Sequence, residues 1–252
     1  MTTDIQPHIR LGKEDNADYA VLPGDPQRVD KVKNFLDNPQ EIAHNREFKT
    51  VSGYYKGVKV LVTSTGIGGA STGIAVEELR KIGVKNLIRI GSCGALQDYI
   101  KLGDLIIATG AVRDDGASNA YIDKSYPAVP DPEILHALMR AAKRLKYTYH
   151  YGKIRSHDSF YTDKEKQIDN YWSEKGILGA DMETSALFVI GGLRNIKAGS
   201  ILNVVVESNG NLEGGINDYV DENIQLIDGE EKEIITALEA IVELNNNLNE
   251  KE

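Results

Sequence analysis

Short apolar runs alternate with helical periodicity along most of this chain, and this alternation limits the possible folds more than any other feature. The apolar runs predict strands at 18–22, 58–64, 86–91, 104–112, 151–156 and 199–206. Apolar residues at helical spacing predict helices at 26–36, 70–82, 131–145, 164–175, 183–194 and 230–248. Such an order of elements is typical of an α/β protein with a largely central sheet.

Composition narrows the class of protein. The net charge is −9 and no basic stripe is present, which argues against binding to nucleic acid. There is no run of 18 apolar residues and no secretory signal, so we expect a protein that neither enters a membrane nor is exported. The single cysteine, Cys93, fits a reducing cytoplasmic compartment and is interpreted as a small buried thiol. No linker divides the chain, so residues 1–252 are predicted to form one domain.

Acidic residues are concentrated late in the chain, at 228–233 and 249–252. We interpret the first group as the solvated start of a helix and the second as a frayed tail.

Residues 179–188 form the most informative motif, Gly-Ala-Asp-Met-Glu-Thr-Ser-Ala-Leu-Phe. It places Met182 and Glu183 where a strand gives way to a helix. Methionine packs well on the carbon face of a sugar, and a carboxylate accepts hydrogen bonds from vicinal hydroxyls. The alternative is that Glu183 only opens the helix, since acids favour the first turn.

Two arginines indicate an anion site. Arg28 lies in the first turn of a predicted helix that follows Gly24, with Asp25 as N-cap and Pro26 at the first position. An ordinary turn with a solvent-facing arginine is the alternative. Arg89 interrupts an apolar strand, where a lone cation would be costly, so it needs a carboxylate or a bound anion as partner.

Glycines follow two of the predicted strands. After the strand that contains Arg89, Ser92 lies in a predicted glycine-bracketed turn and can add a hydroxyl and an N–H group. After the strand at 58–64, Gly66, Gly68 and Gly69 do not match G-x-G-x-x-G, because Ser71 occupies the last glycine position. The next strand also lacks a terminal acid for a cofactor ribose, so we reject a dinucleotide site.

Five motifs share one order with a known family: Pro-Gly-Asp-Pro-x-Arg, Asn-Arg-Glu-Phe, Ser-Thr-Gly-Ile-Gly-Gly, Arg-Ile-Gly-Ser-Cys-Gly and Met-Glu-Thr. Together they resemble the nucleoside phosphorylase family, in its hexameric branch of uridine phosphorylases and bacterial-type purine nucleoside phosphorylases. A parasite purine phosphorylase subgroup is also similar. The resemblance implies a single-domain, three-layer α/β fold with a central mixed β-sheet flanked by helices. It also implies an enzyme that uses inorganic phosphate as co-substrate and no organic cofactor.

The resemblance implies roles for individual residues. Phosphate would be bound by Gly24, Arg28, Arg89, Ser92 and a neighbouring subunit's Arg46, with Arg28, Arg89 and Glu183 central to catalysis. Ribose would be bound by Met182, Glu183 and a neighbouring subunit's His8. Glu47, Ile67 and Ser71 match positions that hold potassium at the dimer interface of some uridine phosphorylases. A dimer is expected to be the smallest active unit, and a hexamer built as a trimer of dimers the assembly.

The base pocket departs from both subfamilies. Phe160 would line sugar and base, and Val205 and Val206 occupy the region where the purine enzymes carry a proton-donating aspartate. Lys164 and Lys166 stand at the spacings where the uridine enzymes carry glutamine and arginine, and lysine cannot form the same bidentate contact. We expect uridine as the substrate. A purine phosphorylase, a nucleosidase and a non-catalytic nucleoside-binding protein are the alternatives. The predicted loops are at 113–126 and 207–221, and the second would cover the base.

Overall fold

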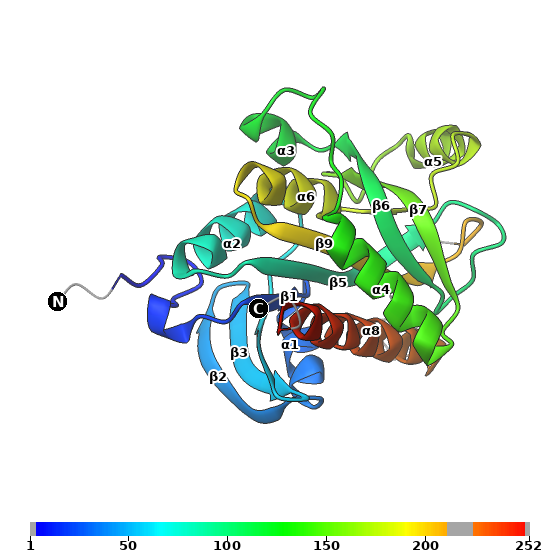
Figure 1. Ribbon diagram of the computed structural model, residues 1–252. Coiled ribbons are helices and arrows are strands. Elements are labelled where there is room, and N and C mark those ends of the chain that lie inside the picture. Colours follow the sequence, from blue (N-terminus) through cyan, green and yellow to red (C-terminus); the bar gives the residue numbers. More distant parts are fainter. Residues whose placement is uncertain (1–3, 211–223, 250–252) are drawn as a thin grey trace.

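A mixed sheet of nine strands is the centre of the computed structural model, which describes residues 4–210 and 224–249 (Figure 1). The strands are β1 Tyr19–Leu22, β2 Asp37–Asn45, β3 Phe48–Tyr55, β4 Val58–Thr63, β5 Asn86–Ala95, β6 Leu105–Asp114, β7 Tyr149–His157, β8 Gly179–Asp181 and β9 Lys197–Val206. The helices are α1 Pro26–Lys33, α2 Gly69–Ile82, α3 Gly116–Tyr121, α4 Pro132–Leu145, α5 Glu165–Glu174, α6 Thr184–Leu193 and α8 Ile224–Asn249, and a short 3-10 turn covers Lys13–Asp15.

The sheet is open at one end and closes on itself at the other. Its order is β2-β3-β4-β1-β5-β8-β7-β6-β9, with a further parallel pairing between β5 and β9. The strands β5, β9, β6, β7 and β8 therefore pair in a ring, and β5 is the strand that joins this ring to the open half. A residue on β5 is thus close to both halves of the sheet.

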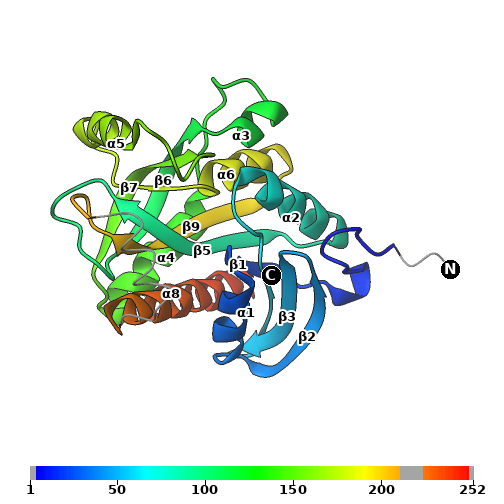
Figure 2. The ribbon, with the colours of Figure 1, turned by 180° about the vertical axis from the view of Figure 1, so that it is seen from behind.

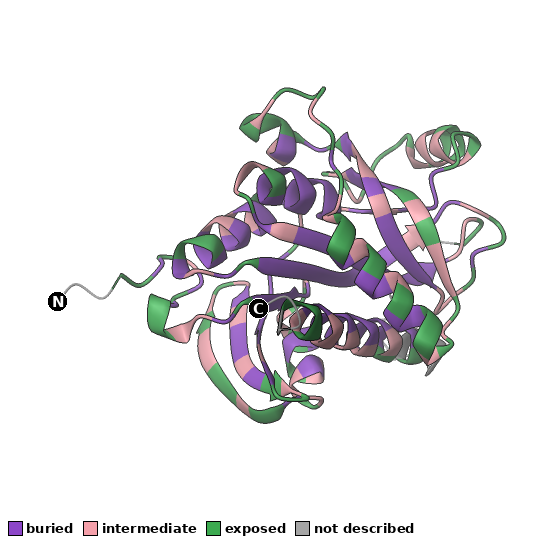
Figure 3. Cartoon of the chain, in the orientation of Figure 1, coloured by how far each residue is buried: buried purple, intermediate pink, exposed green. Residues whose placement is uncertain are grey.

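Helices cover the sheet on two sides, as Figures 1 and 2 show from opposite directions. Apolar residues of α2 and α6 pack into one buried cluster, and those of α1, α4 and α8 pack into another. Burial is almost continuous along β1 and β5 (Figure 3), as expected for strands covered on both faces. The predicted α/β fold with a central mixed sheet and flanking helices is confirmed.

All six predicted strands and all six predicted helices occur, with shifted ends. The prediction missed the hairpin β2–β3, because β2 is a largely exposed polar strand without an apolar signal. It also missed the three-residue strand β8. The loop predicted at 113–126 contains α3, whose start is capped by the Asp115 carboxylate. Arg113 organises this segment by donating to four of its carbonyl oxygens, those of Ser118, Ile122, Asp123 and Tyr126.

Two other local predictions were wrong. Ser92 lies within β5 and not in a turn, because β5 continues to pair with β9 as far as Gly94, with a register shift after Cys93. The prediction of a solvated acidic start for the last helix was wrong for two of its residues: Glu230 and Glu233 are 2% and 0% exposed, whereas Asp228 and Glu231 are exposed. The tail at 250–252, and most of the loop predicted at 207–221, lie outside the described residues. No helix in the described ranges combines the length and apolar character needed to cross a membrane.

Candidate active site

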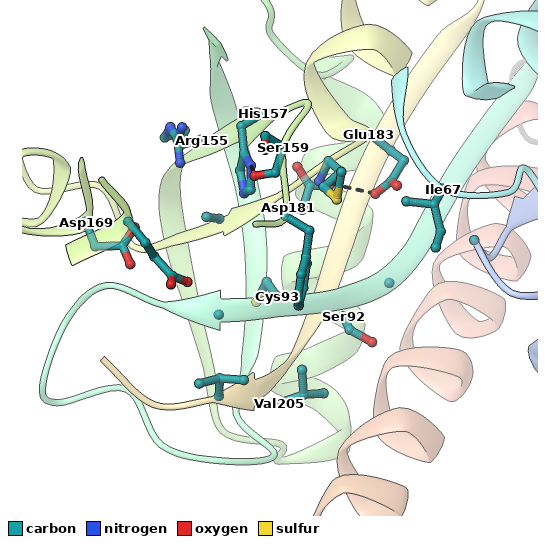
Figure 4. Close-up of a pocket in the computed structure, with 18 of the residues that line it drawn as sticks. Ile67, Ser92, Cys93, Arg155, His157, Ser159, Asp169, Asp181, Glu183 and Val205 are labelled. Atoms are coloured by element: carbon teal, nitrogen blue, oxygen red, sulfur yellow. Dashed lines mark hydrogen bonds between the residues drawn. The ribbon is translucent and has the colours of Figure 1, made fainter. Parts of the chain in front are cut away.

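A cavity of about 1720 Å³ opens beside β5, between the β1–α1 turn and the segment that connects β7 to α5. Figure 4 shows Glu183 and Ile67 together at one end of this cavity and Asp169 at the opposite end. The cavity is lined by most of the residues that the sequence singled out: Gly24, Arg28, Glu47, Ile67, Ser71, Arg89, Ser92, Phe160, Lys166, Met182, Glu183, Val205 and Val206.

The β1–α1 turn forms as its sequence predicts. Asp25 has an extended backbone and its carboxylate accepts a hydrogen bond from the N–H group of Gln27, while Pro26 begins the helix. This geometry directs the N-terminus of α1 at the cavity and buries Arg28, which is only 4% exposed. The alternative of a solvent-facing arginine is therefore excluded.

Arg28 is held on three sides. Its Nε lies 2.9 Å from Oε1 of Glu230, and its Nη1 lies 3.1 Å from Oε1 of Glu233. Its Nη2 donates to the hydroxyl of Ser92 over 2.9 Å. The contact between Arg28 and Ser92 joins the β1–α1 turn to β5, so two predicted phosphate ligands from different elements meet.

Arg89 projects from β5 among carboxylates. Its Nε donates to Asp181 over 3.0 Å, and its Nη2 donates to Glu183 over 2.5 Å. Its Nη1 is buried and has no hydrogen-bond partner among the described residues. A β-carbon on Gly24 would lie 4.0 Å from this Nη1. Arg89 is thus paired internally, as the sequence allowed, yet keeps one donor available beside the predicted phosphate site.

Glu183 lies at the junction between β8 and α6, where its backbone caps the helix but its side chain does not. Its carboxylate instead accepts hydrogen bonds from Arg89 and from the N–H group of Gly68, the latter over 2.6 Å. Burial raises the pKa of Glu183, opposed by Arg89 and reinforced by Asp181. Met182 is next to it and half-buried, so an apolar and an anionic group face the cavity together.

Asp181 anchors this corner of the site. It accepts hydrogen bonds from Arg89, from the hydroxyl of Ser156 over 2.5 Å, and from both the N–H group and the hydroxyl of Thr184. One carboxylate therefore ties β5, β7 and α6 together behind Glu183.

The predicted base-binding residues mostly reach the cavity. Phe160, Val205, Val206 and Lys166 line it, whereas Lys164 caps the start of α5 and is not among the lining residues. Sequence reasoning missed several further lining residues, among them Arg155, His157 and Asp169 (Figure 4). Burial lowers the pKa of His157 and raises that of Asp169.

Besides Lys164, two predicted site residues lie outside this chain's own cavity. His8 packs against α2, with its Nδ1 2.6 Å from Oε1 of Glu78 and its side chain 38% exposed. Arg46 is exposed at the tip of the β2–β3 hairpin, in a left-handed conformation with φ of 56°. The three residues of the predicted cation position are close together. Glu47 and Ser71 both approach Gly66, since a β-carbon on that glycine would lie 2.6 Å from Cγ of Glu47 and 3.3 Å from Oγ of Ser71. Ser71 also donates a hydrogen bond to the carbonyl oxygen of Ile67.

Comparison with known proteins identifies the family. The sequence profile of the Phosphorylase superfamily matches residues 18–243. The chain belongs to the phosphorylase superfamily. It is 42% identical to a uridine phosphorylase of Thermococcus kodakarensis, over 78% of this chain and 76% of that protein. It is 37% identical to a guanosine phosphorylase of Halorubrum lacusprofundi, over 95% of this chain and 99% of that protein.

A solved structure is similar throughout its length. The uridine phosphorylase of Vibrio fischeri, crystallised with 6-hydroxy-1-naphthoic acid, is 46% identical and superposes with a TM-score of 0.89. The match covers 94% of this chain and 96% of that one. The resemblance to nucleoside phosphorylases is thus confirmed, and this phosphorylase is an enzyme of that family.

Some residues of this phosphorylase site had no usable signal in the sequence. Asp181 could have been found, since it stands two residues before Glu183 in the same motif. Glu230 and Glu233 could not have been found in this way. They follow Arg28 by about two hundred residues, so no local pattern links them to that arginine. Cys93 is 3% exposed and burial raises the pKa of its thiol, which confirms the prediction of a buried thiol.

Proposed function

We propose that this protein cleaves a β-ribonucleoside with inorganic phosphate to give the free base and α-ribose 1-phosphate, and that uridine is its preferred substrate. The observation that carries the proposal is the buried guanidinium of Arg89, which contacts the Glu183 carboxylate on one side and offers an unpartnered donor beside Gly24 on the other. The guanidinium can bind an anion while the carboxylate beside it binds a sugar, so the two ligands would lie next to each other.

In the proposed reaction, phosphate is both ligand and nucleophile. Gly24, Arg28, Arg89 and Ser92 would bind it through charge-assisted hydrogen bonds, so that one of its oxygens faces the anomeric carbon. As the bond from that carbon to the base breaks, the sugar gains oxocarbenium character and the base leaves with the electron pair. The bound phosphate stabilises this positive charge and then forms the new bond to the anomeric carbon, so no protein side chain becomes covalently attached.

Glu183 and Met182 would hold the ribose. The carboxylate accepts hydrogen bonds from sugar hydroxyls, and the thioether packs on the carbon face of the ring. Glu183 can turn from Arg89 to the sugar when phosphate replaces it as the partner of the guanidinium.

The base end favours uridine. Val205 and Val206 are buried and apolar, at 1% and 6% exposure, so neither can protonate the N7 atom of a departing purine. Lys166 can donate to a carbonyl oxygen of uracil. The second candidate is a purine nucleoside, favoured by the guanosine phosphorylase that matches nearly the whole chain. In that case Glu207, which lines the cavity, is the first residue to test as the acid.

The active unit is proposed to be a dimer within a cytoplasmic hexamer. Arg46 and His8 would reach the phosphate and the ribose of a neighbouring subunit, which is consistent with their distance from this chain's own cavity. Glu47, Ile67 and Ser71 would hold a monovalent cation at the same interface. An acidic, half-exposed carboxylate beside a carbonyl and a hydroxyl offers the oxygen ligands that such an ion needs.

A substrate panel tests the proposal. Uridine, thymidine, inosine and adenosine are each incubated with and without phosphate, and free base is measured. We expect release that depends on phosphate, with kcat/KM for uridine about two to four decades above that for inosine, since general acid catalysis is worth that much. Base release without phosphate would identify a nucleosidase, and binding without release would identify a binding protein. An equal or higher rate with inosine or adenosine would make the purine candidate correct.

A further inference from the structure

Two carboxylates of α8 stand directly behind Arg28. Glu230 and Glu233 are on the C-terminal helix, about two hundred residues from Arg28 in sequence, and neither lines the cavity. Both are buried, and each forms an ion pair with a different nitrogen of the Arg28 guanidinium. They therefore determine where Arg28 points without touching what Arg28 binds.

The two carboxylates differ in their other partners. The second oxygen of Glu230 lies 2.9 Å from Nζ of Lys31, whose side chain is 41% exposed. The second oxygen of Glu233 accepts only from the N–H group of Gly91 over 3.1 Å, among the described residues. Glu230 thus has two cationic partners and Glu233 has one.

The close approach of α8 to the sheet is a specific feature of the sequence. A β-carbon on Gly229, the residue before Glu230, would collide with Oδ1 of Asn203 and lie 2.8 Å from the Cα atom of Gly103. Glycine at this position lets α8 lie against β9, which brings the next residue to Arg28.

Negative charge exceeds positive charge around the two arginines. Four buried carboxylates, those of Asp181, Glu183, Glu230 and Glu233, surround the two guanidinium groups. Burial raises the pKa of Glu233 to about 8, with Glu230 adding to the shift and Arg28, the Gly91 N–H group and Arg89 opposing it. A dianion bound to Arg28 would disfavour the charged form of Glu233 further.

We propose that Glu230 and Glu233 are positioning residues for phosphate, and that the binding of phosphate dianion is coupled to the uptake of one proton by Glu233. Glu230 keeps its charge and fixes the guanidinium of Arg28. In alkaline solution, Glu233 is a carboxylate that neutralises Arg28 in the empty site. It becomes a neutral carboxyl group, and so releases Arg28, when the anion binds. This inference rests on the proposed phosphate site.

The groups that face Glu233 make it the carboxylate best suited to this exchange. They are Arg28 from α1, Arg89 and Cys93 from β5, and Glu230 from its own helix. Burial also raises the pKa of Glu183, which has a similar pair of partners, Arg89 and the Gly68 N–H group, but Glu183 lines the cavity and is the proposed ribose ligand. Variants of Glu233 therefore show which of the two carboxylates, Glu233 or Glu183, takes up the proton.

Calorimetry of inorganic phosphate binding to the full-length protein tests the coupling. The titration is done at about pH 8.5, where most Glu233 side chains of the empty site are ionised, in two buffers that differ in ionisation enthalpy. For the unaltered protein we expect heats that depend on the buffer and correspond to an uptake of roughly half to three-quarters of a proton. Glu233→Gln should bind phosphate with heats that no longer depend on the buffer. The matched control is Glu231→Gln, the same change at an exposed neighbour on α8, which should behave like the unaltered protein.

Kinetics test the positioning role. Glu230→Gln should raise the KM for phosphate about tenfold, as expected when one charge-assisted contact to Arg28 is lost, and should leave kcat at saturating phosphate within about twofold. Glu231→Gln should change neither value.

Each outcome decides one question. Failure of the unaltered protein to bind phosphate would overturn the proposed function itself. Phosphate binding whose heat is independent of the buffer would overturn the proton coupling and leave the function intact, and this result needs no variant to fold. Buffer-dependent heats that persist in Glu233→Gln would assign the proton to another group. A fall in kcat with an unchanged KM in Glu230→Gln would overturn its positioning role.

Discussion

A β-carbon at position 91 would lie 2.5 Å from Nη2 of Arg89 and 2.7 Å from its Cζ atom. The guanidinium folds back along β5 over this glycine, and only then can it contact Asp181 and Glu183 together. The requirement for glycine here is one of space, since its φ is not in the left-handed region.

Gly91→Ala is expected to displace the Arg89 guanidinium. The variant should raise the KM for phosphate and lower the free energy of unfolding by about 1–3 kcal/mol, the usual cost of overpacking. Gly94→Ala is the matched control for stability, because a β-carbon there meets no atom within 4 Å. Thermal melts of both variants provide the measurement. Equal melting temperatures for the two would show that Arg89 can shift without cost.

Among individual residues, the sequence predicted those that belong to a short local motif. Gly24, Arg28, Arg89 and Glu183 each stand in a short pattern of glycines or apolar residues, and all four line one cavity. Their partners were harder to find. Glu230 and Glu233 hold Arg28 from another element, and such pairings depend on tertiary contacts that no spacing encodes.

Helix α8 makes the stability of this protein depend on pH. Glu233 has a pKa of about 8 in the folded protein, raised first by burial, against an ordinary value of 4.5. The folded state therefore holds a proton that the unfolded state has lost in this window. The stability that this proton contributes is fully present below pH 4.5 and is lost as pH rises toward 8.

Glu233→Gln should remove this dependence, because glutamine does not titrate. Between about pH 6 and pH 8, the free energy of unfolding of the unaltered protein should fall by roughly 2 kcal/mol relative to that of the variant. The slope is at most about 1.4 kcal/mol per pH unit, and it becomes smaller near the pKa of Glu233. Denaturant unfolding at several pH values measures the difference, with Glu231→Gln as the control. A difference that is constant with pH would mean that Glu233 stays ionised throughout.

The elements themselves were predictable where one face or both faces are buried. The strands β1, β5 and β9 are apolar runs, and α4 carries its apolar residues at helical spacing. The hairpin β2–β3 was not predictable, because β2 gains its structure from backbone pairing with β3 and not from an apolar face. The closure of the sheet into a ring was equally hidden, since it depends on the three-residue strand β8.

The whole molecule is expected to work only as an assembly, and subunit mixing tests this. Arg46→Ala removes the residue proposed to be donated to a neighbour, and Arg89→Lys keeps the charge of the receiving site but loses its forked contacts. Each variant alone should have low activity. In a hybrid dimer, one site has both residues intact and the other has neither. Equal mixing should therefore restore about a quarter of the sites, provided that the subunits exchange freely.

Activity that remains at the level of the separate variants after exchange would place Arg46 and Arg89 in the same subunit's site. Ion-exchange chromatography of the mixture is the control. Arg46→Ala removes a positive charge that Arg89→Lys keeps, so hybrids elute between the two parental assemblies. Full activity from a sedimenting monomer would exclude a shared site altogether.

The ion pairs between Arg28 and α8 also have a consequence for the order in which the protein is made. Arg28 leaves the ribosome early, and the two carboxylates that hold it are synthesised about two hundred residues later. Until then the nascent chain carries a helix N-terminus and an arginine with neither of these partners, while the strands around them can already begin to pair. The anion site is therefore among the last parts of the molecule to mature during translation, although its first residues are among the earliest to appear.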